Sequence, residues 1–206
     1  MKTYTAKKTD SKMTMVDNRW DFAECGALDC VWEDYYPSPY TTVFRMVHSE
    51  EGINVKISTD EWPLRTFYMY QGGEVCEDSC AEFFFTPNMT DEEYFNLEVT
   101  AVGTPLLGVG AGRAPRRVKL NVNGTGIEIE TRILPERGWE LLLFIPYSFM
   151  RRHFSGVGSV MRANFYKIGN LTARKHYSAW NKLEIPMPDF HHPEFFGKII
   201  LSEEKI

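Results

Sequence analysis

The chain has 206 residues, of which 43% are hydrophobic and 14% aromatic, and its formal net charge is −5. This hydrophobic fraction excludes a wholly disordered chain, and no run approaches the roughly 20 apolar residues that cross a bilayer. The acidic net charge argues against a nucleic-acid-binding protein, because such proteins carry basic surfaces that neutralise phosphates. We therefore expect a soluble, folded protein with no nucleic-acid partner and no membrane insertion.

The N-terminal segment is polar. Residues 1–18 lack the apolar core of a signal peptide, so we expect a loosely ordered arm and, as the sequence stands, a cytoplasmic location. Export with the signal removed is the alternative. The four cysteines, Cys25, Cys30, Cys76 and Cys80, lack the CxxC spacing of structural zinc sites, which makes free thiols the simplest interpretation. A disulfide stays open for an exported protein.

Short segments with alternating apolar and polar residues dominate the chain, and helical periodicity is scarce. Gly, Pro, Asn and Asp separate these segments, as in β-sandwiches. Helical turns are expected at Thr90–Glu93 and Pro146–His153. The predicted strands are Thr42–Met46, Ile53–Ser58, Ala81–Thr86, Tyr94–Val102, Glu140–Pro146, Met161–Ile168 and Lys198–Ser202.

The clearest alternation lies in Arg117–Thr131, where apolar residues at every second position flank a turn at Asn123–Gly126. This pattern predicts an antiparallel hairpin. The glycines at 108, 110 and 112 superficially resemble a phosphate-binding loop but lack its lysine and helix, so we expect a mobile loop between strands. Together the segments predict one all-β domain over residues 1–206. Its expected architecture is an antiparallel β-sandwich with two sheets, immunoglobulin-like or jelly-roll-like, with short helical turns.

The carboxylates allow two kinds of chemistry. Asp78, Glu82 and Glu98 could supply the acid and base for glycoside hydrolysis. Asp78, Glu82, Glu77 and the backbone carbonyls near them could instead hold calcium, which takes six to eight oxygen ligands. Solvated side chains at strand edges are the simpler interpretation, because sequence spacing does not fix the distances that either chemistry requires.

Aromatic residues are abundant, with 5 Trp, 10 Tyr and 14 Phe. Most are expected in the core. Sugar rings, however, present apolar C–H faces that stack on exposed aromatic rings, while neighbouring polar groups bind the hydroxyls. A glycan-binding site on a β-sandwich is therefore consistent with this composition.

Several separated motifs follow one another in a fixed order. They are Glu77–Pro87, Tyr94–Glu98, Gly103–Thr104, Arg113, Arg162–Tyr166, His176–Asn181 and Pro188–Gly197. Their order resembles that of the carbohydrate-binding family 9-like proteins, relatives of the family 9 carbohydrate-binding modules of xylanases. The resemblance runs from about Trp32 to the C-terminus, and it implies a β-sandwich that binds sugars without cleaving them, with calcium ions supporting the fold.

The resemblance also implies roles for individual residues. In the related modules two tryptophans sandwich a terminal sugar, and Glu, Arg and Asn side chains bind its hydroxyls. Trp180 resembles one of these tryptophans, and Glu82 resembles the hydroxyl-binding glutamate. Asn96 and Glu98, on one face of their strand by alternation, fall near the positions of the Arg and Asn. Arg113 is a further candidate for hydroxyl binding.

Cys76 stands where the second tryptophan is expected, and Trp62 is the candidate replacement upstream. The leading hypothesis is non-catalytic binding of a monosaccharide or an oligosaccharide end by an aromatic platform and polar side chains. A carbohydrate-active hydrolase or lyase using Asp78, Glu82 or Glu98 is the enzymatic alternative. A sandwich that has lost its sugar site and serves protein interaction is the third.

Overall fold

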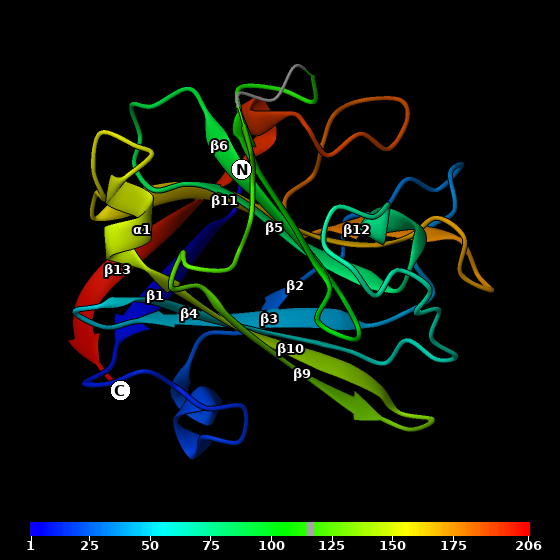
Figure 1. The fold of residues 1–206 in the computed structure, drawn as a ribbon, viewed down its shortest axis with the longest axis horizontal. Helices are drawn as coiled ribbons and strands as arrows, with labels where there is room; N and C mark the ends of the chain where they lie inside the picture. Colours follow the sequence, from blue (N-terminus) through cyan, green and yellow to red (C-terminus); the bar gives the residue numbers. More distant parts are fainter. Residues whose placement is uncertain (115–117) are drawn as a thin grey trace.

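The computed structural model describes residues 1–114 and 118–206, and the described chain is almost entirely β-structure (Figure 1). Helix is confined to α1 (Tyr147–Arg151) and three short 3₁₀ turns, η1 (Asn18–Phe22), η2 (Val75–Glu77) and η3 (Pro193–Phe195). No helix of the described residues has the length and apolar character needed to cross a membrane. The strands are β1 (Thr3–Lys8), β2 (Gly26–Ala27), β3 (Thr42–His48), β4 (Gly52–Thr59), β5 (Cys80–Thr86), β6 (Tyr94–Thr100), β7 (Pro105–Gly110), β8 (Val118–Leu120), β9 (Glu128–Leu134), β10 (Gly138–Pro146), β11 (Val160–Gly169), β12 (His176–Ala179) and β13 (Gly197–Lys205).

These strands form one curled sheet in the order β8-β7-β6-β5-β11-β13-β1-β3-β4-β10-β9, with β12 beside β11 and β2 beside β3. The sheet curls so that β5, β6 and β11 lie over β3, β4 and β10 (Figure 1). Phe44 of β3 and Phe165 of β11 stack across the core with ring centroids 3.8 Å apart. The predicted all-β class is confirmed.

All seven predicted strands are present, with ends shifted by a few residues. The helical turn predicted at Pro146–His153 is present as α1, whereas the described segment 90–93 contains no helix. The predicted hairpin is wrong, because β8 pairs with β7 and β9 pairs with β10 instead of with each other. The glycines at 108 and 110 belong to strand β7 rather than to a loop. Arg117, the first residue of the predicted hairpin, lies outside the described residues.

The N-terminal segment is part of the sheet. Thr3–Lys8 forms β1, which runs parallel to both β13 and β3 and so links the two layers. Its Tyr4 side chain is buried, and the Tyr4 hydroxyl accepts a hydrogen bond of 2.7 Å from the Met46 N–H. The expectation of a loosely ordered arm is therefore wrong for residues 3–8. Only partners distant in sequence stabilise β1, and local periodicity does not reveal them.

Strand β5 is buried on both faces. Its odd-numbered residues point between the layers, where Phe83 stacks on Phe165 at 4.5 Å. Its even-numbered residues point to the outer face, where Phe84 packs against Tyr94 and Tyr166. Further chain segments cover this outer face and form a second apolar cluster over it. The site described below lies in the same covered region.

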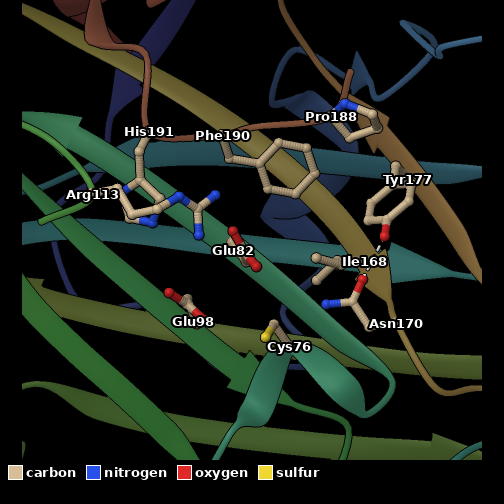
Figure 2. A pocket seen from close by; sticks show the side chains of 10 residues that line it. All are labelled: Cys76, Glu82, Glu98, Arg113, Ile168, Asn170, Tyr177, Pro188, Phe190 and His191. Atoms are coloured by element: carbon tan, nitrogen blue, oxygen red, sulfur yellow. Dashed lines mark hydrogen bonds between the residues drawn. The ribbon is translucent and has the colours of Figure 1, made fainter. Parts of the chain in front are cut away.

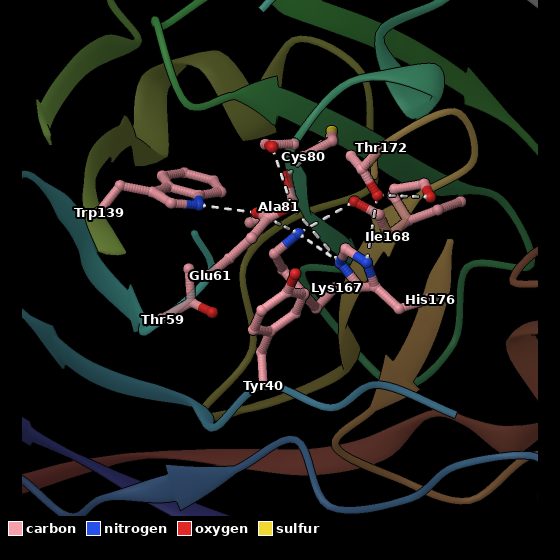
Figure 3. Close-up of polar contacts among 12 residues, drawn as sticks. Tyr40, Thr59, Glu61, Cys80, Ala81, Trp139, Lys167, Ile168, Thr172 and His176 are labelled. Atoms are coloured by element: carbon pink, nitrogen blue, oxygen red, sulfur yellow. Dashed lines mark hydrogen bonds and ion pairs between the residues drawn. The ribbon is translucent and has the colours of Figure 1, made fainter. Parts of the chain in front are cut away.

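A fully buried polar cluster connects β11, β12 and the segment after β4 (Figure 3). The Lys167 ammonium lies 2.8 Å from Oε2 of Glu61 and 2.9 Å from Nε2 of His176. Trp139 Nε1 and the Ser79 hydroxyl also donate to the Glu61 carboxylate, at 3.0 and 2.8 Å. Burial and the neighbouring Lys167 charge lower the pKa of His176 to about 4, so His176 is neutral near pH 7.

Candidate functional site

A pocket of about 180 Å³ lies on the outer face of β5, β6 and β11 (Figure 2). Glu82 of β5 and Glu98 of β6 are direct cross-strand partners, so their side chains project side by side from this face. Asn96 projects from the same face of β6, as its alternation predicts. The residues that line the pocket are Cys76, Glu82, Glu98, Arg113, Ile168, Asn170, Tyr177, Pro188, Phe190 and His191.

Aromatic side chains line the pocket across from Glu98 and Cys76 (Figure 2). The Phe190 ring stacks on Tyr166 with centroids 4.1 Å apart and planes 5° apart, which fixes its orientation. The Tyr177 ring meets Phe190 edge-on at 6.3 Å. Two rings at nearly right angles thus form an apolar corner above the carboxylates.

Polar groups stand at both ends of this corner. At one end, Arg113 Nη2 donates to Asp189 Oδ1 at 2.7 Å. At the other end, the Tyr177 hydroxyl donates to Asn170 Oδ1 at 2.6 Å. The pocket therefore combines a carboxylate floor, an aromatic corner and side chains that donate and accept hydrogen bonds.

The carboxylates occupy an unfavourable electrostatic environment. Glu82 is 2% exposed, and burial together with the charge of Glu98 raises its pKa well above the ordinary value, while Arg113 and Lys167 offset part of this effect. Among the described residues, no group donates a hydrogen bond to the Glu82 carboxyl group. Burial and the two carboxylates raise the pKa of the Cys76 thiol to about 12, so Cys76 is a neutral thiol at physiological pH. A ligand that offers hydroxyl groups would satisfy the buried carboxyl oxygens.

The structure brings four of the predicted site residues together. Glu82, Glu98 and Arg113 line the pocket, and Asn96 Nδ2 donates to Glu98 Oε1 at 2.9 Å. Cys76 also lines it, at the position where the resemblance implies a second tryptophan.

Trp180 is placed elsewhere. It is 3% exposed and lies in the core, where its ring meets Phe44 edge-on at 5.3 Å. Successive residues of a strand point to opposite faces, so Tyr177 reaches the outer pocket while Trp180, three residues later, points inward. The expectation of a stacking platform at Trp180 is therefore corrected, and Tyr177 and Phe190 are the aromatic residues of the pocket. Alternation along 176–180 was the signal that could have identified Tyr177.

Two further expectations are also corrected by the geometry. Trp62 is 38% exposed and does not line the pocket. Asp78 is fully buried and is bonded to the Arg65 guanidinium and to the backbone N–H groups of Phe67 and Tyr68, both at 2.8 Å. Asp78 therefore holds the preceding loop in place and does not face the pocket.

The proposed calcium ligands do not fit a metal site. Asp78 is surrounded by hydrogen-bond donors, Glu77 accepts from the Tyr68 hydroxyl at 2.7 Å, and Glu82 faces the pocket. Within residues 1–114 and 118–206, no group of three or more His, Cys, Asp or Glu side chains is arranged to hold a metal ion. The three carboxylates have separate surroundings and do not converge on one point, as ligands of a shared calcium ion would.

A concave pocket that combines aromatic rings with a few placed polar groups is typical of small-molecule binding sites. The chain matches the family described as carbohydrate-binding family 9 over residues 11–201, and it belongs to this family. The resemblance derived from the motif order is thereby confirmed. The function it implies, non-catalytic carbohydrate binding, is the function that the family assignment supports.

Solved structures share the fold over nearly the whole chain. A Bacteroides uniformis protein, described as a candidate carbohydrate-binding protein, is 28% identical with a TM-score of 0.84, and the match covers 98% of this chain and 99% of that one. A family 9 carbohydrate-binding module from Caldicellulosiruptor kristjanssonii is 12% identical with a TM-score of 0.72. That match covers 99% of this chain and 95% of the module in its cellotriose complex, or 97% in its glucose complex. Comparison with curated proteins gave no match.

Proposed function

We propose that the protein binds the end of a carbohydrate chain, without cleaving it, in the pocket between Glu82, Glu98 and Phe190. The observation that carries this proposal is the pair of buried carboxyl groups beneath an aromatic corner. The scaffold that we propose for it is the two-sheet sandwich expected from the resemblance. The two layers that pack across the core support this arrangement.

The size of the pocket favours a single sugar unit. Its volume of about 180 Å³ is below the roughly 300 Å³ at which pockets for drug-sized ligands begin. A terminal sugar ring fits this description better than an internal stretch of a polysaccharide. The structural relatives that hold glucose and cellotriose point to glucose units as the first ligands to test.

The pocket chemistry matches a sugar ring. Sugar hydroxyls would donate to Glu98 and Glu82 and accept from the Arg113 guanidinium, while the C–H face of the ring would contact Phe190 and Tyr177. Hydrogen bonds to charged groups contribute about 1.5–3 kcal/mol each, so a few of them give useful affinity for a small neutral ligand.

The same two carboxyl groups motivated the enzymatic alternative. Glycoside hydrolases place their two carboxyl groups on either side of the scissile bond. Glu82 and Glu98 instead project side by side from adjacent strands, so both would approach a ligand in the pocket from the same side. This arrangement supports a binding role for the pair.

Calorimetric titration with glucose, cellobiose and cellotriose tests the proposal. We expect millimolar or tighter binding by the wild-type protein, and affinity about 10- to 150-fold weaker for Glu98→Gln, because a hydrogen bond to a charged group is lost. Glu130→Gln is the matched control, since Glu130 is an exposed carboxylate on β9, in the other layer of the fold. Failure of all three sugars to bind, or full affinity in Glu98→Gln, would contradict the proposal.

Trp180→Phe serves as a second control in the same titration. Because Trp180 packs in the core, this variant should unfold at a lower temperature yet retain sugar affinity once folded. If Trp180→Phe instead lost sugar affinity while its stability was unchanged, Trp180 would be the residue that contacts the sugar.

A further inference from the structure

The outer face that carries the pocket continues sideways across β7 and β8. Glu98 of β6 is the cross-strand partner of Leu106 in β7, and Asn96 is the partner of Gly108. Gly108 in turn pairs with Lys119 of β8. Directly opposed residues of neighbouring strands share a face, and strands are about 4.8 Å apart. Leu106 and Lys119 therefore extend the two rows that contain Glu98 and Asn96.

A second cavity of about 280 Å³ lies at the end of these rows. Leu106 lines this cavity, and its cross-strand partner Glu98 lines the first pocket. The chain segment 71–76 also borders both, because Gly72 lines the second cavity and Cys76 lines the first. The two cavities therefore adjoin, and the second also reaches Leu107 and Leu120, whose side chains pack towards the core between the layers. The second is lined by Gln71, Gly72, Leu106, Leu107, Lys119, Leu120 and Asn121.

The lining of the second cavity suits a polyhydroxyl ligand. Lys119 and Asn121 are exposed side chains that carry hydrogen-bonding groups, and Gln71 contributes an amide. The half-buried Leu106 supplies apolar surface beside them. This mixture of polar groups and aliphatic surface can receive both the hydroxyls and the C–H groups of a sugar ring.

The chain segment 71–76, which borders both cavities, is held in place by hydrogen bonds of the residues on either side of it. The backbone N–H groups of Phe67 and Tyr68 donate to the buried Asp78, and the Tyr68 hydroxyl donates to Glu77. Within the segment itself, Gln71 Nε2 donates to the Leu120 carbonyl of β8 at 2.7 Å. A preformed wall loses little conformational entropy when a ligand binds.

We propose that the second cavity is a subsite for a sugar further along the chain whose end occupies the first pocket. This inference rests on the proposed function. The ligand it describes is an oligosaccharide that runs across β6, β7 and β8, rather than an isolated monosaccharide. The loop at residues 67–72 forms one border of its path.

The test compares glucose with cellotriose by calorimetric titration of the full chain. Wild-type protein should bind cellotriose at least about tenfold more tightly than glucose, as expected for an added hydrogen-bonding subsite. Lys119→Ala and Asn121→Ala should each remove several-fold of this difference and leave glucose affinity unchanged, because both side chains line the second cavity only. Lys198→Ala is the matched control, because Lys198 is an exposed lysine on β13, outside both cavities.

The outcomes separate the two proposals. If wild-type protein binds glucose and cellotriose equally, or if both subsite variants keep the full difference, the subsite is refuted while the first pocket stands. If a subsite variant loses glucose affinity to the same extent as cellotriose affinity, the second cavity has no separate role and the inference fails. If glucose and cellotriose both fail to bind to the wild-type protein, the proposed function fails as well.

Discussion

Glu82 illustrates the conflict between binding and stability at a single residue. Folding places its carboxyl group in a buried position beside Glu98, where a negative charge is unfavourable. Among the described residues, no hydrogen bond to the carboxyl group compensates for this burial. A side chain that destabilises the fold in this way is a candidate for function, because groups with strongly shifted pKa values concentrate at functional sites.

Glu82→Gln is therefore expected to raise the melting temperature at neutral pH while weakening sugar binding. The pKa of Glu82 is raised in the folded state, so the folded protein retains a proton that the unfolded chain releases. The stability of the wild-type protein consequently falls as pH rises above the ordinary glutamate pKa, and the neutral glutamine removes this effect. The advantage of the variant should be small at pH 4 and grow towards pH 8, with about 2–4 °C for each kcal/mol.

Thermal unfolding from pH 4 to pH 8 measures this difference, and Glu130→Gln provides the control for loss of an exposed carboxylate. Parallel pH profiles of the melting temperature for the wild-type protein and Glu82→Gln would show that folding does not raise the pKa of Glu82.

At this scale the sequence predicted the polar residues of the site better than the aromatic ones. Glu82, Glu98 and Arg113 follow from the motif order and line the pocket. Trp180 also follows from the motifs but lies in the core, because it comes directly after β12 and points to the opposite side from Tyr177. Phe190 belongs to the segment before η3, where no strand alternation indicates which way a side chain points.

At the scale of elements, the buried cluster around Glu61 joins the β11–β12 pair to the β4–β10 pair, which are not neighbours in the sheet. Lys167 lies on β11, His176 begins β12, Trp139 belongs to β10, and Glu61 follows β4. Each of these side chains is buried. Removing one member of a buried ion pair leaves the other charge without compensation, which costs more than the pair itself contributes.

Lys167→Met is accordingly expected to destabilise the protein by about 3–5 kcal/mol, since Glu61 is left buried with its charge unpaired. The double variant Lys167→Met, Glu61→Gln should be more stable than Lys167→Met alone. Chemical denaturation of the single and double variants measures this coupling. Additive effects of the two substitutions would show that the two groups do not interact as the geometry indicates.

Strands rich in β-branched and aromatic residues were predictable, because burial on one or both faces leaves a local pattern. Strand β1 was not predictable, because its partners β13 and β3 are remote in sequence. The pairing of β8 was missed for another reason: β8 pairs with the preceding strand β7 and not with the strand that follows it. The hairpin expected near residues 123–126 followed a genuine turn signal. In the structure, however, β8 pairs with β7 and β9 pairs with β10, so the two strands that flank this turn do not pair with each other.

On the scale of the whole molecule, the site depends on how the curled sheet is covered. The pocket floor comes from β5 and β6, whereas its walls come from η2, the loop after β7, β12 and the segment before η3 (Figures 1 and 2). No short sequence motif contains these parts together. Only the order of several motifs along nearly the entire chain indicated the family, and the family match over residues 11–201 agrees with that extent.

A crystal structure of the protein soaked with cellotriose would test the central claim most directly. We predict density for a terminal glucose unit with hydroxyls within hydrogen-bonding distance of Glu82 and Glu98 and its ring against Phe190, and with the next units directed towards Leu106 and Lys119. Sugar density centred on Trp62, or an unoccupied pocket at saturating cellotriose, would contradict the account.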